Sequence, residues 1–530
     1  MNDLIIIGSG AAGAWAAYQA ASRGLVPLVI DVGLQPVEEP ALARGFFALR
    51  QQDVRQAEYL LGPEFESLHN IHQRYLSPRL KPPRLRFVTN RADELAPLAR
   101  MGFDPIQSFA LGGLANAWGA GVYRYHEEDL KPFSLAPTDL DPYYDILTRE
   151  IGISGTVDDL HDHFGSAQGL QKPLKIDSLA ERFFHSYQRH RSYFHRNGLK
   201  AGRPRLAILS EDLNDRKACS YDHLSFWQPN LSYLYTPAMT VKELIRKNKI
   251  QYADQRLVLG FKEGKEEVRI KVRDLEGNGY EELTAKMVVL AAGALNSGRI
   301  VLQSYGDYQT RLPLLENQTS LTPLLYPFFV GRPFDEVSHG LTQLNLLYSG
   351  PQWASYVQGS YYSFNSCLSS DIFKDMPLAA RGNLCGIKYL LPAISILQLF
   401  YRDEPKEGNF LQLSAEGKLI TSYTDKRPLG KVERHMIRLF RRAGFISHPG
   451  LSQYPTPGNG IHYAGTLPMS ATSARPYQTD LRGRLNGTQR VYVADASVFP
   501  VLPAKNHTFT LMANAMRVVD CLIKDLGAAR

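Results

Sequence analysis

A glycine-rich turn between a strand and a helix constrains the fold of this chain more than any other feature of its sequence. The apolar residues 4–7 are typical of a strand buried on both faces, Ala11–Ser22 is rich in the best helix former, and Leu28–Ile30 is a second apolar run. The turn itself, residues 8–13, has the spacing G-x-G-x-x-G. Together these ranges predict a parallel βαβ unit, and therefore an α/β fold with a Rossmann-like domain.

The same turn predicts a dinucleotide-binding site. Gly8 permits the tight turn, Gly10 lets the backbone approach a pyrophosphate, and Gly13 lets the helix pack closely on the strand. The helix N-terminus adds amide donors, and Asp31 ends the second strand, where a carboxylate can accept hydrogen bonds from ribose hydroxyls. Nicotinamide and flavin cofactors both use such a turn, so the unit alone leaves the choice between them open. The cofactor contacts expected here are Gly8, Gly10, Ala11, Ala12, Gly13 and Asp31.

The length of the chain predicts more than one domain. Single hydrophobic cores stop growing well below 530 residues, so we expect two domains or one domain with a large insertion. Hydrophobic residues make up 44% of the chain, which excludes wholesale disorder. The net charge of +8 is modest for this length, and Lys and Arg form no long block, so nucleic-acid binding is not predicted.

The cysteines and the apolar runs of the sequence bear on where in the cell the protein is expected. Cys219, Cys367, Cys385 and Cys521 form no C-x-x-C pair, so neither a metal site nor a disulfide framework is predicted. No positively charged leader precedes the first strand. The longest apolar stretch, residues 389–401, is too short to span a bilayer, and we expect a buried strand or core segment there. These observations predict a cytoplasmic protein without a membrane span.

The middle of the chain differs in pattern from its two ends. Residues 268–272 alternate between apolar and charged side chains, and residues 280–286 return, which predicts a half-exposed hairpin leading into a buried strand at 287–290. Residues 305–455 are rich in Tyr, Ser and Pro and contain several strand-like runs. This composition, together with the strand-like runs, predicts an inserted, mainly antiparallel β-sheet substrate domain with flanking helices.

These patterns give a discontinuous domain prediction. The cofactor domain is expected over residues 1–160, 230–305 and 456–530, and the substrate domain over 161–229 and 306–455. Further elements are expected within these segments, namely a helix at Asp141–Ile151, a helix face at Val432, Met436, Leu439, Phe440 and Ala443, a strand at 490–494 and a helix at 510–526. Residues 50–105 lack a clean period and are placed on the surface or over the active site.

Three further segments, taken with the first thirty residues, resemble one enzyme family. Residues 111–125 read LGGLANAWGAGVYRY, residues 288–302 contain AAGALNSGR, and residues 479–517 contain VADASVFP. In this order the segments are similar to the signatures of the glucose-methanol-choline (GMC) oxidoreductase superfamily. The resemblance covers both ends and the middle of the chain, and it implies an FAD enzyme that oxidises an alcohol.

The resemblance also implies contacts to FAD from several loops. The glycine pair and Asn after residue 111 would lie against the pyrophosphate and isoalloxazine, because the backbone must approach a flat ring there. The AAG turn would pass near the adenosine half, and the Asp-Ala pair of the last strand would lie beside the pyrophosphate and the ribityl chain. The implied contacts are Gly112, Gly113, Asn116, Ala292, Gly293, Asp495, Ala496 and Asn506.

One departure from the family bears on how FAD is held. In pyranose-oxidase-like relatives that attach FAD covalently, a histidine stands just before the Trp that corresponds to Trp118. Here that position is Ala117. The comparison therefore implies non-covalent FAD.

The catalytic groups are implied by two C-terminal stretches. Residues 461–469, IHYAGTLPM, resemble the family's H-x-x-G-T-x-x-M and imply that His462 is the base. A neutral imidazole can take the hydroxyl proton near pH 7 while hydride passes from the alcohol carbon to flavin N5. In residues 505–510, Asn506 occupies the family's Asn position and His507 the position used by some His-containing members. Asn506 is favoured as the amide that hydrogen-bonds the alcohol oxygen, with His507 as the alternative.

The resulting hypothesis is an FAD-dependent oxidoreductase acting on CH–OH donors, with O₂ or a quinone-type molecule as electron acceptor. Its substrate would be a small-molecule alcohol such as a sugar, a polyol or a natural-product hydroxyl. The aromatic residues 219–235 either line the substrate pocket or pack in the core. Three alternatives stay open: a lyase or non-redox flavoprotein of the same fold, an oxidoreductase acting on another donor, and an FAD-stabilised scaffold without activity.

Overall fold

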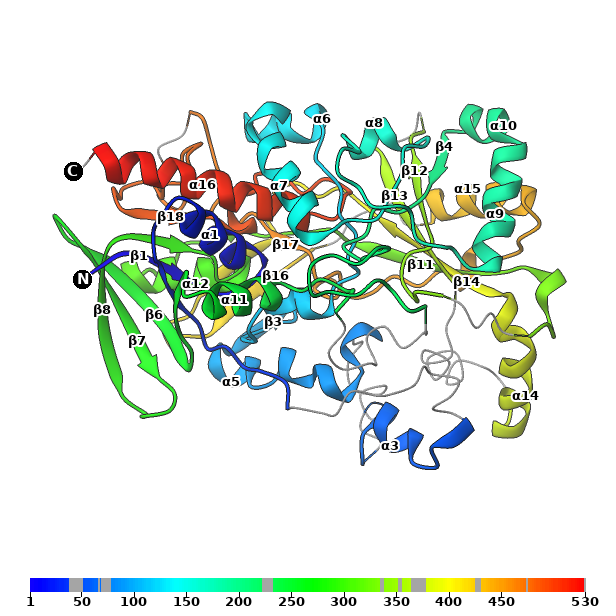
Figure 1. Ribbon diagram of the computed structural model, residues 1–530, viewed down its shortest axis with the longest axis horizontal. Helices are drawn as coiled ribbons and strands as arrows, with labels where there is room; N and C mark the ends of the chain where they lie inside the picture. Colours follow the sequence, from blue (N-terminus) through cyan, green and yellow to red (C-terminus); the bar gives the residue numbers. More distant parts are fainter. Residues whose placement is uncertain are drawn as a thin grey trace.

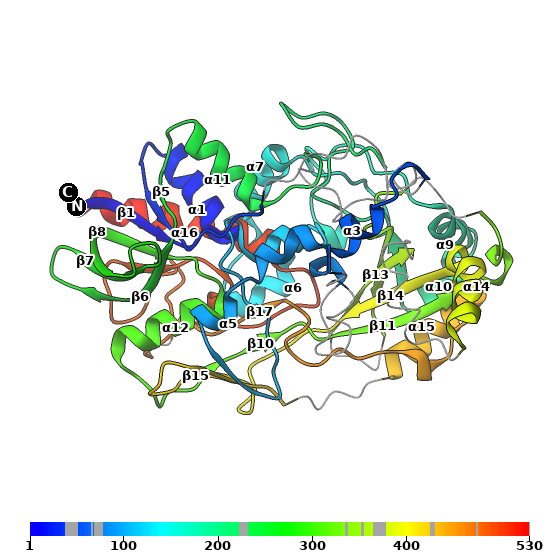
Figure 2. The ribbon, with the colours of Figure 1, turned by 90° about the horizontal axis from the view of Figure 1, so that it is seen from below.

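In the computed structural model of the chain, the described residues are 1–37, 51–64, 67, 78–221, 232–333, 338–350, 355–363, 378–424, 430–472 and 475–528. Both termini lie at one end of the elongated molecule, beside a sheet that contains the first strand (Figure 1). A second sheet, which has five strands, lies toward the other end (Figures 1 and 2).

The predicted βαβ unit forms the centre of the first sheet. β1 (Asn2–Ile7) pairs in parallel with β2 (Leu28–Ile30) on one side and with β8 (Tyr280–Leu290) on the other. β5 (Gln251–Ala253) extends the sheet beyond β2, and β18 (Val491–Val493) pairs in parallel with the end of β8. The α/β fold class and the Rossmann-like core are confirmed.

The returning strand of the predicted hairpin and the buried strand that follows it form one continuous strand, β8. The first half of β8 pairs with β7 (Val268–Asp274), which in turn pairs with β6 (Arg256–Glu263). The second half of β8 pairs with β1, and Ala285 is paired to both neighbours. The apolar–polar alternation ends where the strand enters the core, in agreement with the prediction that the hairpin leads into a buried strand.

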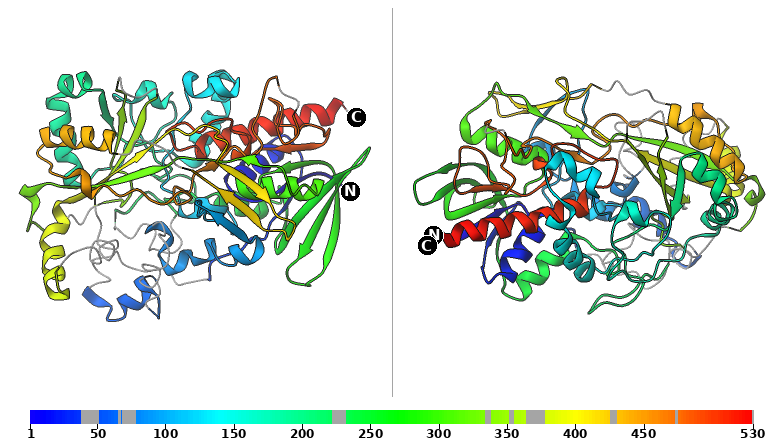
Figure 3. Two further views of the ribbon diagram at one scale, coloured as in Figure 1. Left: turned by 180° about the vertical axis from the view of Figure 1, so that it is seen from behind. Right: turned by 90° about the horizontal axis from the view of Figure 1, so that it is seen from above.

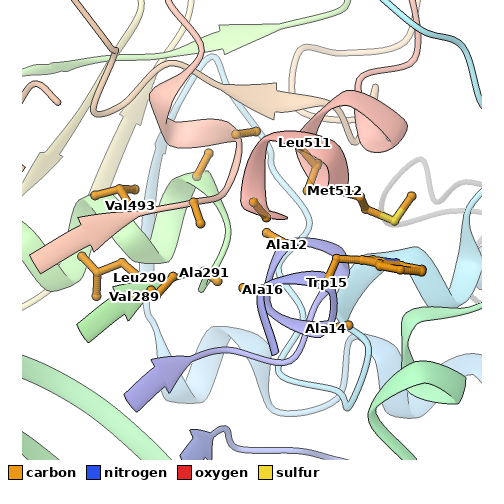
Figure 4. Close-up of a cluster of buried hydrophobic side chains, with 14 of the residues drawn as sticks. Ala12, Ala14, Trp15, Ala16, Val289, Leu290, Ala291, Val493, Leu511 and Met512 are labelled. Carbon is orange, nitrogen blue, oxygen red and sulfur yellow. The ribbon is translucent and has the colours of Figure 1, made fainter. Parts of the chain in front are cut away.

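Two helices cover one face of this sheet and pack against each other. They are α1 (Ala11–Ser22), with the bounds predicted, and the long C-terminal α16 (Thr508–Ala528). Figure 4 shows the small side chains Ala12 and Ala16 in one buried cluster with Leu511 and Met512. Alanines on α1 let the helix lie close to its neighbours, which brings the N-terminus of α16 near the glycine turn.

The second sheet is antiparallel throughout, in the order β11-β14-β13-β12-β4. Its strands are β4 (Leu199–Gly202), β11 (Thr319–Leu325), β12 (Leu344–Tyr348), β13 (Val357–Ser363) and β14 (Ile394–Phe400). The apolar stretch 389–401 thus supplies the end of a helix and then β14, in agreement with a strand in the core.

Helices α9 (Ser178–Arg189) and α15 (Lys431–Arg442) cover the outer face of this sheet (Figure 3). Phe183 of α9 stacks on Phe440 of α15 with ring centroids 4.2 Å apart. The predicted apolar face of α15 is buried in this layer. The opposite, inner face of the five-stranded sheet faces the first sheet.

Smaller elements connect the two sheets. β10 pairs with β17, and a four-stranded sheet of order β3-β16-β15-β9 joins residues that the domain prediction assigns to both parts, so that division stays a prediction. The remaining helices and strands are α3 (Gln56–Leu61), α5 (Ala92–Leu95), β3 (Leu98–Met101), α6 (Glu127–Leu130), α7 (Asp141–Ile151), α8 (His161–Phe164), α10 (Arg191–Arg196), α11 (Pro237–Arg246), α12 (Ala294–Tyr305), β9 (Leu312–Pro313), β10 (Leu315–Glu316), α14 (Ala380–Leu390), β15 (Phe410–Leu413), β16 (Leu419–Ser422) and β17 (Tyr463–Ala464).

Several expectations concern features of the chain outside the two sheets. Cys219, Cys385 and Cys521 are free thiols, and Cys367 lies outside the described residues. Within the described ranges no cluster of His, Cys, Asp and Glu could hold a metal ion. None of the helices in those ranges combines the length and apolarity that crossing a bilayer requires. Tyr233 and Tyr235 pack in the core, whereas residues 222–231 lie outside the described part of the chain.

Candidate active site

A cavity of about 830 Å³ extends from the glycine turn to the inner face of the five-stranded sheet. Residues from both ends and the middle of the chain line it, as the four motifs require if they serve one site. The predicted residues on its wall are Gly8, Gly10, Ala11, Ala12, Asp31, Gly113, Ala292, Gly293, His462, Asp495, Ala496, Asn506 and His507.

Three predicted cofactor residues do not line the cavity. A side chain at Gly13 would overlap the carbonyl oxygen of Gly8, in keeping with its expected role in helix–strand packing. The Asn116 amide donates to the carbonyl oxygens of Leu111 and Gly113, at 2.8 Å each, and so shapes the loop from behind. Gly112 has a φ of +87° and lies against Ala238. The resemblance had placed Gly112 and Asn116 facing the cofactor.

Asp31 lies where the second strand meets the glycine turn. The backbone N–H of Ser9 donates to Asp31 Oδ2 at 3.0 Å, and the Ser9 hydroxyl donates to the same oxygen. Burial raises the pKa of Asp31 to about 6, against the opposing effect of these hydrogen bonds. The carboxyl group therefore ties the turn to the end of β2 and also borders the cavity.

Asp495 holds a second loop in place. Its Oδ2 accepts from the Gly293 N–H at 2.9 Å and from the Ser297 hydroxyl at 2.5 Å, and its Oδ1 accepts from the Ser497 N–H at 2.9 Å. Burial raises the pKa of this carboxyl group, whereas its hydrogen bonds act in the opposite direction. Asp495 fixes the AAG turn to the end of β18, a structural task that the motif alone did not reveal.

The segment before His462 is held under strain. The Glu316 carboxylate accepts from the N–H groups of Gly458 and Gly460, at 2.8 Å each. Ile461 has a φ of +59°, a conformation that costs energy for a β-branched residue. Pairing of β17 with β10 fixes the chain on the other side of His462. The imidazole thus projects from a segment that is fixed on both sides.

Three polar groups at this end of the cavity carry unpaired atoms. The rings of His462 and His507 lie 4.9 Å apart at 84°, and Asn506 precedes His507. His462 Nδ1, His507 Nδ1 and Asn506 Oδ1 are buried, and the described residues offer none of them a hydrogen-bond partner. Buried polar atoms are nearly always satisfied in folded proteins. Three such atoms around one cavity therefore mark a place for the polar atoms of a ligand.

Both imidazoles are held in the neutral form at neutral pH. Burial lowers the pKa of His462 to about 4, and the positive charge of Arg79 acts in the same direction. Burial also lowers the pKa of His507 well below its usual value, and His462 adds to this effect. A neutral imidazole can accept a proton, which is what a general base requires.

Sequence reasoning missed Arg79. Its Nη2 donates to the Tyr362 hydroxyl at 3.0 Å, and its guanidinium lies beside Gly119, which leaves room for it. Arg79 belongs to the aperiodic residues 50–105, where no motif distinguishes one arginine from another. The prediction that this segment lies over the active site holds for Arg79 and Lys81, which line the cavity.

Comparison with known proteins agrees with this site. The family described as GMC oxidoreductase matches residues 434–515, a range that includes His462, Asn506 and His507. A relative from Streptomyces lividus, 6'''-hydroxyparomomycin C oxidase, is 24% identical over 100% of this chain and 92% of its own length. Paromamine 6'-oxidase from Streptomyces fradiae is 23% identical over 99% of this chain and 92% of its own length.

A solved structure supports the fold. Pyridoxine 4-oxidase from Mesorbium loti superimposes with a TM-score of 0.58 at 14% identity, covering 98% of this chain and 99% of the other. The GMC family is in general FAD-dependent. The family match, the fold and the oxidase relatives together support the GMC oxidoreductase superfamily and an oxidoreductase that acts on CH–OH donors.

Proposed function

We propose that this protein binds FAD non-covalently and oxidises a hydroxyl of a sugar, polyol or natural product to the carbonyl. In this proposal His462 is the base and Asn506 orients the hydroxyl, with His507 as the alternative. The observation that carries it is the group of three unpaired polar atoms, His462 Nδ1, His507 Nδ1 and Asn506 Oδ1, in the cavity that begins at the glycine turn.

The shape of the cavity supports the choice of FAD. A side chain on Gly10 would meet no atom within 4 Å, so open space lies over the turn where a pyrophosphate would approach the backbone. Ala117 offers no nucleophile for covalent attachment at the family's position. When bound, FAD supplies the acceptor for the hydride that leaves the alcohol carbon.

The protein residues control the proton and the orientation. His462 takes the hydroxyl proton, which leaves electron density on oxygen that favours departure of hydride from carbon. The amide of Asn506 holds that oxygen, and Gly121 makes room for the amide, because a Cβ there would lie 2.9 Å from Asn506 Nδ2. Phe400 stacks on His462 at a centroid distance of 5.7 Å and limits rotation of the imidazole.

The electron acceptor in this proposal is O₂. Both curated relatives are oxidases by name, which supports O₂ over a quinone. Their names also support a natural-product hydroxyl as the position attacked.

The first test is reduction of the cofactor without oxygen. We expect the purified protein to show visible flavin absorption and to lose it when an alcohol substrate is added anaerobically, because the alcohol delivers two electrons. Admission of air is expected to restore the absorption. A lyase or non-redox flavoprotein would keep its absorption with every alcohol, and a protein that takes up no FAD on reconstitution would refute the proposal.

The second test is the pH dependence of catalysis. Because burial disfavours the imidazolium, His462 stays neutral until the pH falls to about 4. We expect kcat/KM to be flat through pH ~6.5, the usual histidine value, and to fall only as the pH approaches 4. An acid limb centred near ~6.5 would contradict this assignment.

One control separates catalysis from folding. The unfolded chain binds more protons than the folded one between the two pKa values of His462, so acid also lowers stability. Circular dichroism at each pH, with an assay after return to neutral pH, distinguishes reversible protonation from unfolding.

A further inference from the structure

The substrate end of the cavity is bounded by one face of two paired strands. Alternate residues of β11 and β14 line it, because side chains of a strand point to opposite faces in turn. The strand register places them side by side as four cross-strand pairs, Thr319–Phe400, Leu321–Gln398, Pro323–Ile396 and Leu325–Ile394. We refer to these eight residues as the β-wall.

The intervening side chains fix which residues face the cavity. Leu397 and Leu399 are buried in the outer core with α9 and α15. A shift of the register by one residue would move these leucines to the cavity, so the outer core holds the β-wall in place. The packing of the outer core therefore determines which side chains form the β-wall.

The β-wall and its surroundings are mainly apolar. Of its eight residues only Thr319 and Gln398 carry polar groups. Leu390, Ile446 and Leu451 border the same cavity, and Ile446 and Leu451 are about half exposed at 49% and 54%. The apolar surface therefore continues from the cavity to solvent, which provides an entry route for an apolar molecule.

The charges in the cavity disfavour a cation. Among the described lining residues, the carboxylates are Asp31 and Asp495, which lie at the glycine and AAG turns and accept the hydrogen bonds given above. The β-wall contributes no carboxylate. Arg79, beside Tyr362 of β13, places a positive charge close to His462. An ammonium group bound here would be desolvated, unpaired and repelled.

We infer that the substrate is an alcohol with an apolar, uncharged body that packs on the β-wall and presents its hydroxyl to His462 and Asn506. This inference rests on the proposed function of the site. It separates this protein from the two oxidases named for aminoglycosides, since an amine-bearing sugar finds no carboxylate at the β-wall.

The test compares alcohols that differ in one group. The probes are benzyl alcohol, para-isopropylbenzyl alcohol and para-(aminomethyl)benzyl alcohol, with paromamine as a polycationic probe. We expect the isopropyl compound to exceed benzyl alcohol in kcat/KM by at least about tenfold, since a buried methylene is worth ~10-fold or more. We expect the aminomethyl compound and paromamine to fall below benzyl alcohol.

Variants of the wall test its role directly. Ile396→Ala is expected to lower kcat/KM for the isopropyl compound by about tenfold. Ile396→Asp is expected to raise the aminomethyl-to-isopropyl ratio by about tenfold or more, because it supplies a partner for the ammonium group. Ile245→Asp, on the outer surface of α11 at 37% exposure, is the matched control and should change neither ratio.

The outcomes distinguish failure of the proposed function from failure of the substrate inference. If no alcohol bleaches the flavin, the proposed function fails. If alcohols bleach it but the amine probes are used as well as or better than the isopropyl compound, only the substrate inference is overturned. The wild-type ratios require no variant, so poor folding of Ile396→Asp leaves the inference open to refutation.

Discussion

His462→Ala is expected to lower the rate of anaerobic flavin reduction by alcohol about 10²–10⁴-fold, while the protein retains its FAD. The reason is that the variant lacks the group that accepts the hydroxyl proton. The neighbouring His507 ring, 4.9 Å away, has no proton-accepting role in this proposal. Stopped-flow absorbance of the flavin measures the rate, and the visible spectrum before mixing measures cofactor content.

A matched histidine provides the control for this variant. His185 is exposed on α9 and is not among the residues that line the cavity, so His185→Ala should leave the reduction rate unchanged. Retention of FAD by His462→Ala would show that the loss lies in the chemistry and not in assembly. A reduction rate within about tenfold of the wild type would remove His462 from the role of base, given the ~10²–10⁴-fold effect expected.

Local patterns predicted the cofactor-binding core well. The bounds of Ala11–Ser22, Leu28–Ile30 and Asp141–Ile151 match the structure. The first is rich in Ala, the second is a short apolar run, and the third has a proline in its first turn. The resemblance also selected three polar residues, His462, Asn506 and His507, that the fold brings to one cavity. Their chemical roles stay proposals until the variants are measured.

Features that depend on tertiary geometry could not be predicted in this way. The β-wall exists only because β11 and β14 pair in one register, and neither strand reveals its partner. Asp495 has the expected position, but the hydrogen bonds that turn its oxygens toward Gly293 and Ser497 become visible only in the folded chain. Arg79 reaches the site from an aperiodic segment, so position in space, not sequence context, identifies it.

Lys505→Met is expected to destabilise the protein by about 3–5 kcal/mol, because it leaves a buried carboxylate without its partner. Lys505 is fully buried, and its Nζ donates to Asp129 Oδ2 at 2.7 Å and to the carbonyl oxygens of His163 and Arg124 at 2.6 and 3.1 Å. Burial lowers the pKa of Lys505, whereas Asp129 raises it. Urea denaturation of the wild type and the variant measures the loss as a shift of the midpoint.

A double variant distinguishes the unpaired charge from lost packing. Asp129 is 3% exposed and also accepts from the Tyr356 hydroxyl at 2.7 Å, so Asp129→Asn keeps the shape while it removes the charge. Lys505→Met/Asp129→Asn should therefore recover most of the lost stability, since removing both charges of a buried pair costs far less than removing one. A double variant no more stable than Lys505→Met would show that the charge is not the cause. Because Lys505 immediately precedes Asn506, recovery of stability without recovery of alcohol oxidation would further show that the ion pair positions the catalytic loop in addition to stabilising the fold.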